Sequence, residues 1–190
     1  VNWLTGDYEG DSYGNGCAMR ISSIGFLCNS LEEVKEESYK ATIPSHNHEE
    51  SIKCAEAVAV SIFLLRNGLP KEKLKEYIEN NYFKLDYNLD DLRLNYLFTS
   101  RAIDSVPQAI YCFLESKDFE NAIRISLSIG GDSDTIAAIT GALAEAYYGV
   151  PEDLIEKVNP YLRDYMNPVL EKYYGKNKKK VLEVKHVKES

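Results

Sequence analysis

Residues 128–149 read SIGGDSDTIAAITGALAEAYYG. Paired glycines and two aspartates come first, and a run of small and apolar residues follows them. Four of the larger residues share one helical face: Ile136, Ile139, Leu143 and Tyr147. Because alanine and glycine fill most of the other positions, neighbouring elements can approach this helix closely. We therefore predict that residues 134–148 form a central and nearly fully buried helix, which Gly149 ends.

The acidic turn before this helix has the ligands of a cation site. Asp132, Asp134 and Thr135 offer only oxygen atoms, which suit Mg²⁺, Mn²⁺ or Ca²⁺ better than zinc. An EF-hand is excluded, because Ile136 and Ala137 stand where that loop needs an oxygen ligand and a glycine. A phosphate-binding loop is excluded as well, because acidic residues follow the glycines in place of a Lys-Ser/Thr pair. The motif alone also fits an aspartate-rich helix cap without a metal, so both interpretations stay open.

Helical patterns extend over the rest of the chain. The predicted helices are 31–42, capped by Ser30 with Glu33; 48–67, capped by Asn47 with Glu50; 70–82, which begins at Pro70; 105–115, capped by Ser105 with Gln108; and 118–129, which begins at Asp118. Residues 83–104 lack a regular pattern and are predicted to be a connection. Because the chain has neither an internal repeat nor alternating strand and helix patterns, we predict an all-α fold.

Length and charge limit the classes to which the protein can belong. A chain of 190 residues favours one domain with a proper core. Six lysines and two glutamates fall within residues 176–190, which leaves 16 basic and 28 acidic residues in 1–175. We therefore predict a single acidic domain at 1–175, which repels nucleic acid, and a solvated basic tail at 176–190.

The apolar residues and the cysteines indicate a compartment. No apolar run approaches the ~20 residues that span a membrane, and the first residues lack a signal-peptide pattern. The four cysteines, Cys17, Cys28, Cys54 and Cys112, form no CxxC pair and are expected to stay reduced. These observations predict a cytoplasmic protein that does not enter a membrane.

Two further segments carry polar residues in short blocks. Residues 12–20 read SYGNGCAMR, and residues 45–53 read SHNHEESIK. Gly14 and Gly16 allow close backbone approach, and the Asn15 amide can bond sugar hydroxyls, although a tight turn explains the same residues. With the acidic turn and its helix, these blocks resemble those of the ADP-ribosylglycohydrolases, the family that includes the dinitrogenase reductase-activating glycohydrolase. The three blocks stand in the family's order and cover residues 12–149.

The resemblance implies a fold and also a missing part. It implies a compact, orthogonal multi-helix domain that lacks the family's usual N-terminal helices. In relatives, that N-terminal region commonly carries a Thr-Asp-Asp segment, which supplies the other half of a two-metal site. No Thr-Asp-Asp occurs in this sequence. We therefore expect the chain to be a fragment, one half of a split enzyme, or a shortened relative.

The resemblance also implies an activity and a site. It implies a metal-dependent hydrolase that cleaves the glycosidic bond between ADP-ribose and a modified protein or small molecule. Asp132, Asp134 and Thr135 would hold Mg²⁺ or Mn²⁺ in a site that this sequence does not complete. The expected contacts to ADP-ribose are Tyr13, Gly14, Asn15, Gly16, His46, Gly130, Gly131 and Ser133. No residue is identified as the general acid or base.

A second hypothesis is a catalytically inactive domain that binds ADP-ribose or a protein. Departures from the family's blocks favour it, including Glu49 and Ser51 in the second block and Ala102-Ile103 in place of a Cys-Gln pair. The partners expected under the two hypotheses are an ADP-ribosylated protein or an ADP-ribose-like ligand, a separate N-terminal half, or a second copy of the chain. His48 is expected to begin a helix and not to share a metal with His46, because side chains one residue apart point to different sides.

Overall fold

The computed structural model of the chain describes residues 10–175. The predicted basic tail at 176–190 lies outside this range. Within it the chain forms helices and no strand, and isolated bridges pair Asp11 with His46 and Gly14 with Arg101. The prediction of an all-α fold is confirmed.

The helices follow one another closely along the chain. They are α1 (Gly16–Met19), α2 (Ser22–Leu27), α3 (Leu31–His46), α4 (Glu49–Arg66), α5 (Lys71–Asn81), α6 (Leu89–Asn95), α7 (Val106–Leu114), α8 (Phe119–Ser128), α9 (Ser133–Tyr148) and α10 (Glu152–Val158), followed by the short 3₁₀ turns η2 (Asn159–Tyr161) and η3 (Asp164–Met166). A further helical segment occupies residues 167–175.

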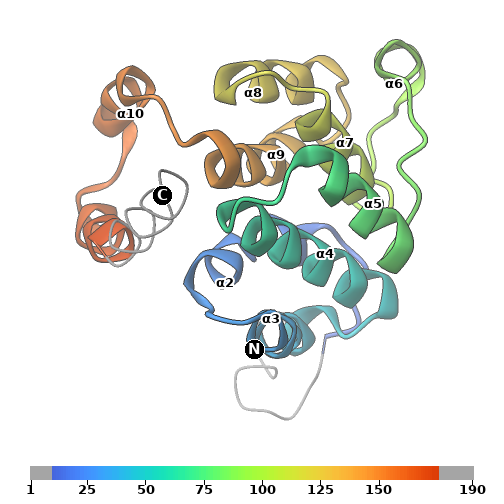
Figure 1. Ribbon diagram of the computed structural model, residues 1–190, viewed down its shortest axis with the longest axis horizontal. Helices are drawn as coiled ribbons and strands as arrows, with labels where there is room; N and C mark the ends of the chain where they lie inside the picture. Colours follow the sequence, from blue (N-terminus) through green and yellow to red (C-terminus); the bar gives the residue numbers. More distant parts are fainter. Residues whose placement is uncertain (1–9, 176–190) are drawn as a thin grey trace.

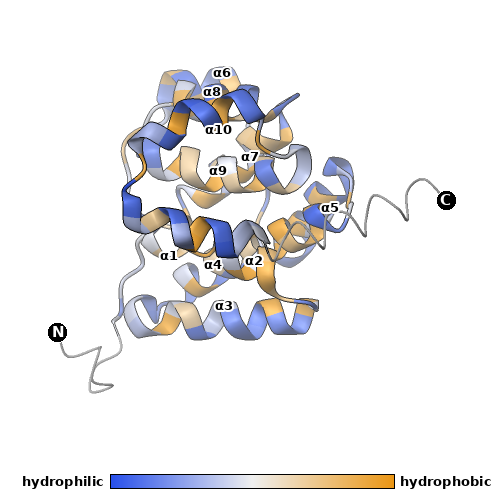
Figure 2. Ribbon diagram, turned by 90° about the vertical axis from the view of Figure 1, so that its left-hand side faces the viewer, coloured by the Kyte–Doolittle hydropathy of each residue, from blue (hydrophilic) through white to orange (hydrophobic). Residues whose placement is uncertain are grey.

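The helices are stacked in layers around α4. Helix α3 covers one side of α4, and α9 packs on the other side, with α7 beside α9 and α8 beyond them (Figure 1). The same order from α3 through α4 and α9 to α8 is visible after a quarter turn (Figure 2). Helix α10 stands to one side of this stack, and none of its residues is buried.

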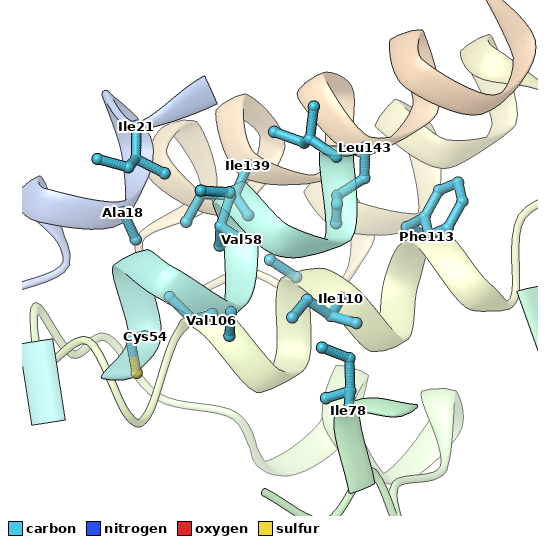
Figure 3. Packing of buried hydrophobic residues seen from close by; sticks show 14 of the residues in the cluster. Ala18, Ile21, Cys54, Val58, Ile78, Val106, Ile110, Phe113, Ile139 and Leu143 are labelled. Atoms are coloured by element: carbon cyan, nitrogen blue, oxygen red, sulfur yellow. The ribbon is translucent and has the colours of Figure 1, made fainter. Parts of the chain in front are cut away.

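Helix α4 is the most deeply buried element. Ten of its eighteen residues are buried: Ser51, Cys54, Ala55, Ala57, Val58, Ala59, Val60, Ser61, Ile62 and Leu65. The buried hydroxyl of Ser61 donates to the Ala57 carbonyl at 2.6 Å, so it leaves no unpaired polar group. Close to α4 in the core lie Val106 and Ile110 from α7 and Ile139 and Leu143 from α9 (Figure 3). A helix with so many buried apolar residues belongs at the centre of the protein.

The prediction that α9 is nearly fully buried is wrong. One face is buried, through Thr135, Ile136, Ile139, Thr140, Leu143 and Ala144. Ala138 on the opposite face is exposed, and Tyr147, predicted to lie on the apolar face, is 41% exposed. Small residues permit close packing but do not require it, because an exposed alanine costs little. The central position belongs to α4.

Several helix starts match the capping patterns of the sequence. Ser30 Oγ accepts from the Glu33 amide at 3.1 Å, and Asp118 Oδ1 accepts from the Asn121 amide at 2.7 Å. The cap of α4 was assigned wrongly to Asn47. His48 is the cap, and its Nδ1 accepts from the Glu50 amide at 3.3 Å.

Two further boundaries differ from the predictions. Helix α3 continues to His46 and includes Pro44, where the pattern predicted an end at residue 42. The segment 83–104, predicted to be irregular, contains α6, whose cap Asn88 accepts from the Asp90 and Asp91 amides. Asn88 followed by two acidic residues is a capping signal that could have revealed this helix.

Lys71 joins α5 to the end of α7. Its ammonium group donates to the carbonyl groups of Phe113, at 3.0 Å, and of Ser116. It also lies 4.8 Å from the ring centre of Phe113 and 5.0 Å from that of Tyr148. The last carbonyl groups of a helix have no partner inside it, and Lys71 adds a charged donor to those at the end of α7, beside Ser116 and Tyr148.

We expect Lys71→Met to lower the free energy of unfolding by about 1–3 kcal/mol, because partly buried carbonyl groups lose one of their donors and the rings lose a cation. Chemical denaturation measures the change. Lys73→Met on the same helix is the matched control, because its exposed ammonium bonds only Glu76, at 2.8 Å. Equal losses in the two variants would contradict the role given to Lys71.

The turn before α9 needs both of its glycines. Gly130 and Gly131 have φ angles of +75° and +68°, a region that other residues adopt at a cost. A Cβ atom at Gly131 would lie 2.2 Å from Cε1 of Tyr96, whereas one at Gly130 would meet no atom within 4 Å. Tyr96 is held in turn by a hydrogen bond from its hydroxyl to the Asp104 carbonyl at 2.7 Å.

This difference predicts unequal effects of alanine at the two positions. Gly130→Ala should cost roughly 1–2 kcal/mol, the strain of the left-handed backbone alone. Gly131→Ala should cost about 1–3 kcal/mol more, because the Tyr96 ring must move. Thermal unfolding of both variants measures the difference, and equal melting temperatures would show that Tyr96 yields without cost.

Candidate functional site

The three sequence blocks meet in space. The cap residue of α1, Asn15, donates to Asp132, the cap residue of α9, at 2.7 Å. The hydroxyl of Ser51, in the first turns of α4, donates to the Ser12 carbonyl at 3.0 Å. Residues more than a hundred positions apart therefore share one site, with the amino ends of α1, α4 and α9 close to it. Helix amino ends carry partial positive charge and favour anions nearby.

The acidic turn presents its oxygens at the start of α9. Asp132 is partly buried, Asp134 is exposed, and the Thr135 side chain is buried beneath them. The Thr135 hydroxyl donates its hydrogen to Met19 Sδ at 3.7 Å. This contact does not use the lone pairs of the Thr135 oxygen. Asp132 stands at the cap position of α9, but its side chain makes no hydrogen bond to the backbone of that helix. The interpretation as a helix cap alone therefore does not explain this residue.

The two aspartates are close enough to influence each other. The pKa of Asp134 is lowered, first by a hydrogen bond with the Asp132 carboxyl group and then by the backbone amides of Thr135 and of Asp134 itself. Two carboxyl groups at hydrogen-bonding distance repel one another when both are ionised. A cation between them removes that repulsion.

Asn15 connects the first block to the acidic turn. Its side chain is 6% exposed, and Nδ2 donates to Asp132 Oδ2 at 2.7 Å and to Ser105 Oγ at 3.1 Å. Both amide hydrogens are therefore used inside the protein. A direct contact of this amide with a sugar hydroxyl stays a prediction, and it would have to use the amide oxygen.

His46 packs against the glycines of the first block. Its Nε2 lies 3.4 Å from the place that a Cβ atom of residue 16 would occupy, and 3.8 Å from that of residue 14. Its Nδ1 lies 2.8 Å from Ser45 Oγ and 3.4 Å from Arg20 Nη2. Arg20 can only donate, so Nδ1 is an acceptor and the proton of the neutral ring is on Nε2, beside the glycines.

The charge state of His46 agrees with this assignment. Burial lowers the pKa of His46, and the positive charge of Arg20 lowers it further. The ring is therefore neutral at pH 7. Arg20 also donates to the Ser45 hydroxyl, so its guanidinium group takes part in a structural contact.

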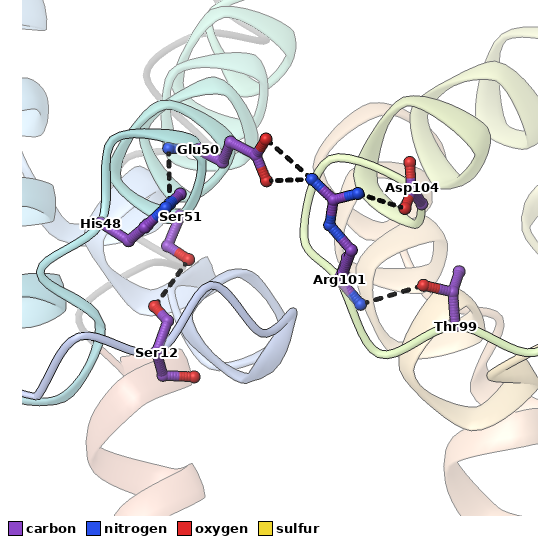
Figure 4. Close-up of polar contacts among 7 residues, drawn as sticks. All are labelled: Ser12, His48, Glu50, Ser51, Thr99, Arg101 and Asp104. Atoms are coloured by element: carbon purple, nitrogen blue, oxygen red, sulfur yellow. Dashed lines mark hydrogen bonds and ion pairs between the residues drawn. The ribbon is translucent and has the colours of Figure 1, made fainter.

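Tyr13 forms an exposed edge of the site. Its side chain is 53% exposed, and its ring lies 5.7 Å from the His48 ring and 5.8 Å from the Arg101 guanidinium carbon. Arg101 forms two 2.9 Å bonds with the Glu50 carboxylate and lies 3.6 Å from Asp104 (Figure 4). These contacts fasten residues 99–104 to the start of α4.

Three further expected contacts belong to the acidic turn. Gly130 faces open space, Gly131 lies under the Tyr96 ring, and Ser133 is the partly exposed first residue of α9. The turn thus presents backbone and small side chains between its two carboxylates and Tyr96. Whether a ligand touches these three residues stays a prediction.

Sequence reasoning missed residues in the segment 96–105. Tyr96 supports the acidic turn, Arg101 pairs with Glu50, and Ser105 accepts from Asn15. Ser105 was taken for a side-chain cap of α7, but it makes no such bond and instead donates to the Arg101 carbonyl at 2.9 Å. No local pattern in the sequence signals these contacts, because each partner is far away along the chain or in a loop.

Within residues 10–175, no cluster of three or more histidine, cysteine or acidic side chains is arranged to hold a metal. As candidate ligands of a cation, the acidic turn offers two carboxylates and one hydroxyl.

In the same part of the chain, no helix has the length and apolar character needed to cross a membrane.

Curated proteins share sequence with this chain. The ADP-ribosylarginine hydrolase Tri1 of Pseudomonas putida is 27% identical in an alignment 172 residues long, which covers 83% of this chain and 45% of Tri1. The ADP-ribosylhydrolase ARH3 of Mus musculus is 27% identical in an alignment 187 residues long, which covers 74% of this chain and 50% of ARH3. The chain thus spans about half the length of these curated relatives.

A solved structure and a family model extend the similarity. A chain of an ADP-ribosylglycohydrolase-related protein complex matches with a TM-score of 0.64 and 25% identity, covering 77% of this chain and 56% of that one. The model of the ADP-ribosylglycohydrolase family matches residues 2–181. Since that match includes all three blocks and the helices that bring them together, this chain belongs to the ADP-ribosylglycohydrolase family.

Proposed function

We propose that the protein is a metal-dependent hydrolase that cleaves the glycosidic bond between ADP-ribose and a modified protein or small molecule. The observation that carries this proposal is the pair Asp132 and Asp134, which stands where the three family blocks meet and is held there by Asn15. The names of the relatives support the substrate class, because Tri1 is an ADP-ribosylarginine hydrolase and ARH3 an ADP-ribosylhydrolase.

The oxygens of the acidic turn fit a hard divalent cation in kind. Asp132 and Asp134 supply negative charge, and Thr135 supplies a neutral oxygen whose hydrogen is given to Met19. Oxygen ligands of this kind favour Mg²⁺ or Mn²⁺. When bound, such a cation would orient the ribose hydroxyls and make a water molecule more acidic.

The other residues of the site would bind the nucleotide. The Nε2 hydrogen of neutral His46 points along Gly14 and Gly16 and can donate to an oxygen of the ligand. The exposed Tyr13 ring offers an apolar face at the edge. As the glycosidic bond breaks, positive charge develops on the sugar, and the carboxylates of the acidic turn favour it.

The ligand set is incomplete within residues 10–175. Two-metal catalysis needs further oxygen ligands, and no third acidic side chain joins Asp132 and Asp134 there. We propose that the remaining ligands, and the general acid or base, come from another segment of the same polypeptide, from a separate chain, or from a second copy. Reduced, buried cysteines support the expected cytoplasmic location.

A second candidate function is binding of ADP-ribose without catalysis. The same incomplete ligand set favours it, because His46, Tyr13 and the glycine block could hold a nucleotide even where no water is activated. The two candidates differ in turnover and agree in binding.

The metal is tested by titration of the protein with Mn²⁺. We expect weak binding by the wild-type chain and at least about tenfold weaker binding by Asp134→Ala, because charged ligands set the affinity of such sites. Asp153→Ala is the matched control, since this aspartate is on α10 and pairs with Lys157 at 2.8 Å. Equal affinity in the wild type and Asp134→Ala would remove the metal from the proposal.

The activity is tested by release of ADP-ribose from ADP-ribosylated arginine. With too few ligands, these 190 residues alone should release little or none. Addition of the N-terminal part of a longer relative, fused or as a separate chain, should restore turnover. Bound ADP-ribose without turnover in that mixture would favour the binding domain. Strong Mn²⁺-dependent release by the chain alone, abolished in Asp132→Ala, would mean that another ligand is present.

A further inference from the structure

Asn15 is buried at the centre of the candidate site, and its side chain touches two other segments. Nδ2 lies 2.7 Å from Asp132 Oδ2 and 3.1 Å from Ser105 Oγ. The first distance is that of a short hydrogen bond to a carboxyl oxygen. The acidic turn is therefore joined to the first block by a directional bond as well as by packing.

The hydrogen-bond partners fix which way the Asn15 amide faces. Ser105 Oγ donates its hydrogen to the Arg101 carbonyl at 2.9 Å, so towards Asn15 it can only accept. A flipped amide would set its oxygen against that acceptor and against the carboxylate of Asp132. The NH₂ group must therefore face both partners.

The backbone of Asn15 is held as firmly as its side chain. Its amide donates to the Ser100 carbonyl at 2.7 Å, and its carbonyl accepts from the amides of Ala18 and Met19. The donor group thus stands at a defined place before any ligand arrives. Asp132, by contrast, follows two glycines and makes no side-chain cap of its own helix.

We propose that Asn15 is a positioning residue that holds the Asp132 carboxylate in the orientation the cation needs. One oxygen of Asp132 accepts from Asn15, and the remaining lone pairs stay available as ligands. Affinity for the cation then depends on Asn15, although Asn15 does not touch it, as with other groups that orient metal ligands. The inference rests on the proposed metal site and assigns to Asn15 a role other than contact with the sugar.

A merely structural tie between α1, α7 and α9 is the alternative. Such a tie would hold the helices together and would weaken the whole site when removed. The positioning role predicts that the effect runs through Asp132 alone. Two measurements separate these cases, and the first needs no metal.

The first measurement follows the side-chain NH₂ signals of Asn15 by ¹⁵N NMR in the metal-free protein. We expect one proton shifted downfield and slow to exchange with solvent. In Asp132→Asn this proton should move upfield, whereas the matched change Asp134→Asn, at a residue that contacts Asp132 but does not accept from the Asn15 amide, should move it much less. Signals that respond equally to the two variants would overturn the proposal.

The second measurement is Mn²⁺ affinity, in variants that remain folded by circular dichroism. Asn15→Ala should weaken binding about 10–100-fold, and Ser105→Ala, which cuts the tie to α7 but keeps the bond to Asp132, should weaken it less than threefold. In an Asp132→Ala background, Asn15→Ala should cause no additional loss. Additional loss there, or equal effects of Asn15→Ala and Ser105→Ala, would show a structural tie only.

The metal site and the role of Asn15 can be refuted separately. If the wild-type chain binds no Mn²⁺, the proposed metal site fails, and the NMR result alone decides whether Asn15 holds Asp132. If the wild type binds Mn²⁺ and Asn15→Ala binds it equally well, the metal site stands and the role of Asn15 is refuted.

Discussion

The deep burial of α4 is the constraint on which the rest of the structure depends. Because ten of its eighteen residues are buried, other helices must cover it, and α3, α2, α1 and α9 all do so. Its start then lies between the first block and the loop that contains Arg101, where Ser51 bonds Ser12 and Glu50 bonds Arg101. The location of the site thus follows from the packing of the core.

Local signals in the sequence predicted most of the helices, and burial was harder to infer. Ser30 and Asp118 cap their helices as expected, because a cap is made by residues only three positions apart. The choice between Asn47 and His48 was wrong, since both can accept a backbone hydrogen bond and the entry angle of the chain decides. Burial of α9 was overestimated because a thin helix can be covered on one face only.

The candidate site shows the same limit more sharply. The residue types were chosen from the blocks, and the structure places Asn15 beside Asp132 and His46 beside Gly16. The contacts that support these residues could not be predicted from the sequence. Tyr96 packs on Gly131 from a loop without periodicity, and no spacing rule connects such a ring to a glycine 35 positions later. Long-range contacts of this kind depend on the whole fold.

The buried thiols have a consequence for how the molecule can be observed. Burial raises the pKa of Cys17, Cys54 and Cys112, and only the ionised sulfur reacts with alkylating agents. Cys17 also contacts the carbonyl groups of Gly14 and Ser51, 3.3 and 3.4 Å away. The alkylation rate of each thiol therefore depends on how often its surroundings open. The rate at which Cys17 is alkylated in the intact protein reports how often the segment beside the glycine block opens to solvent.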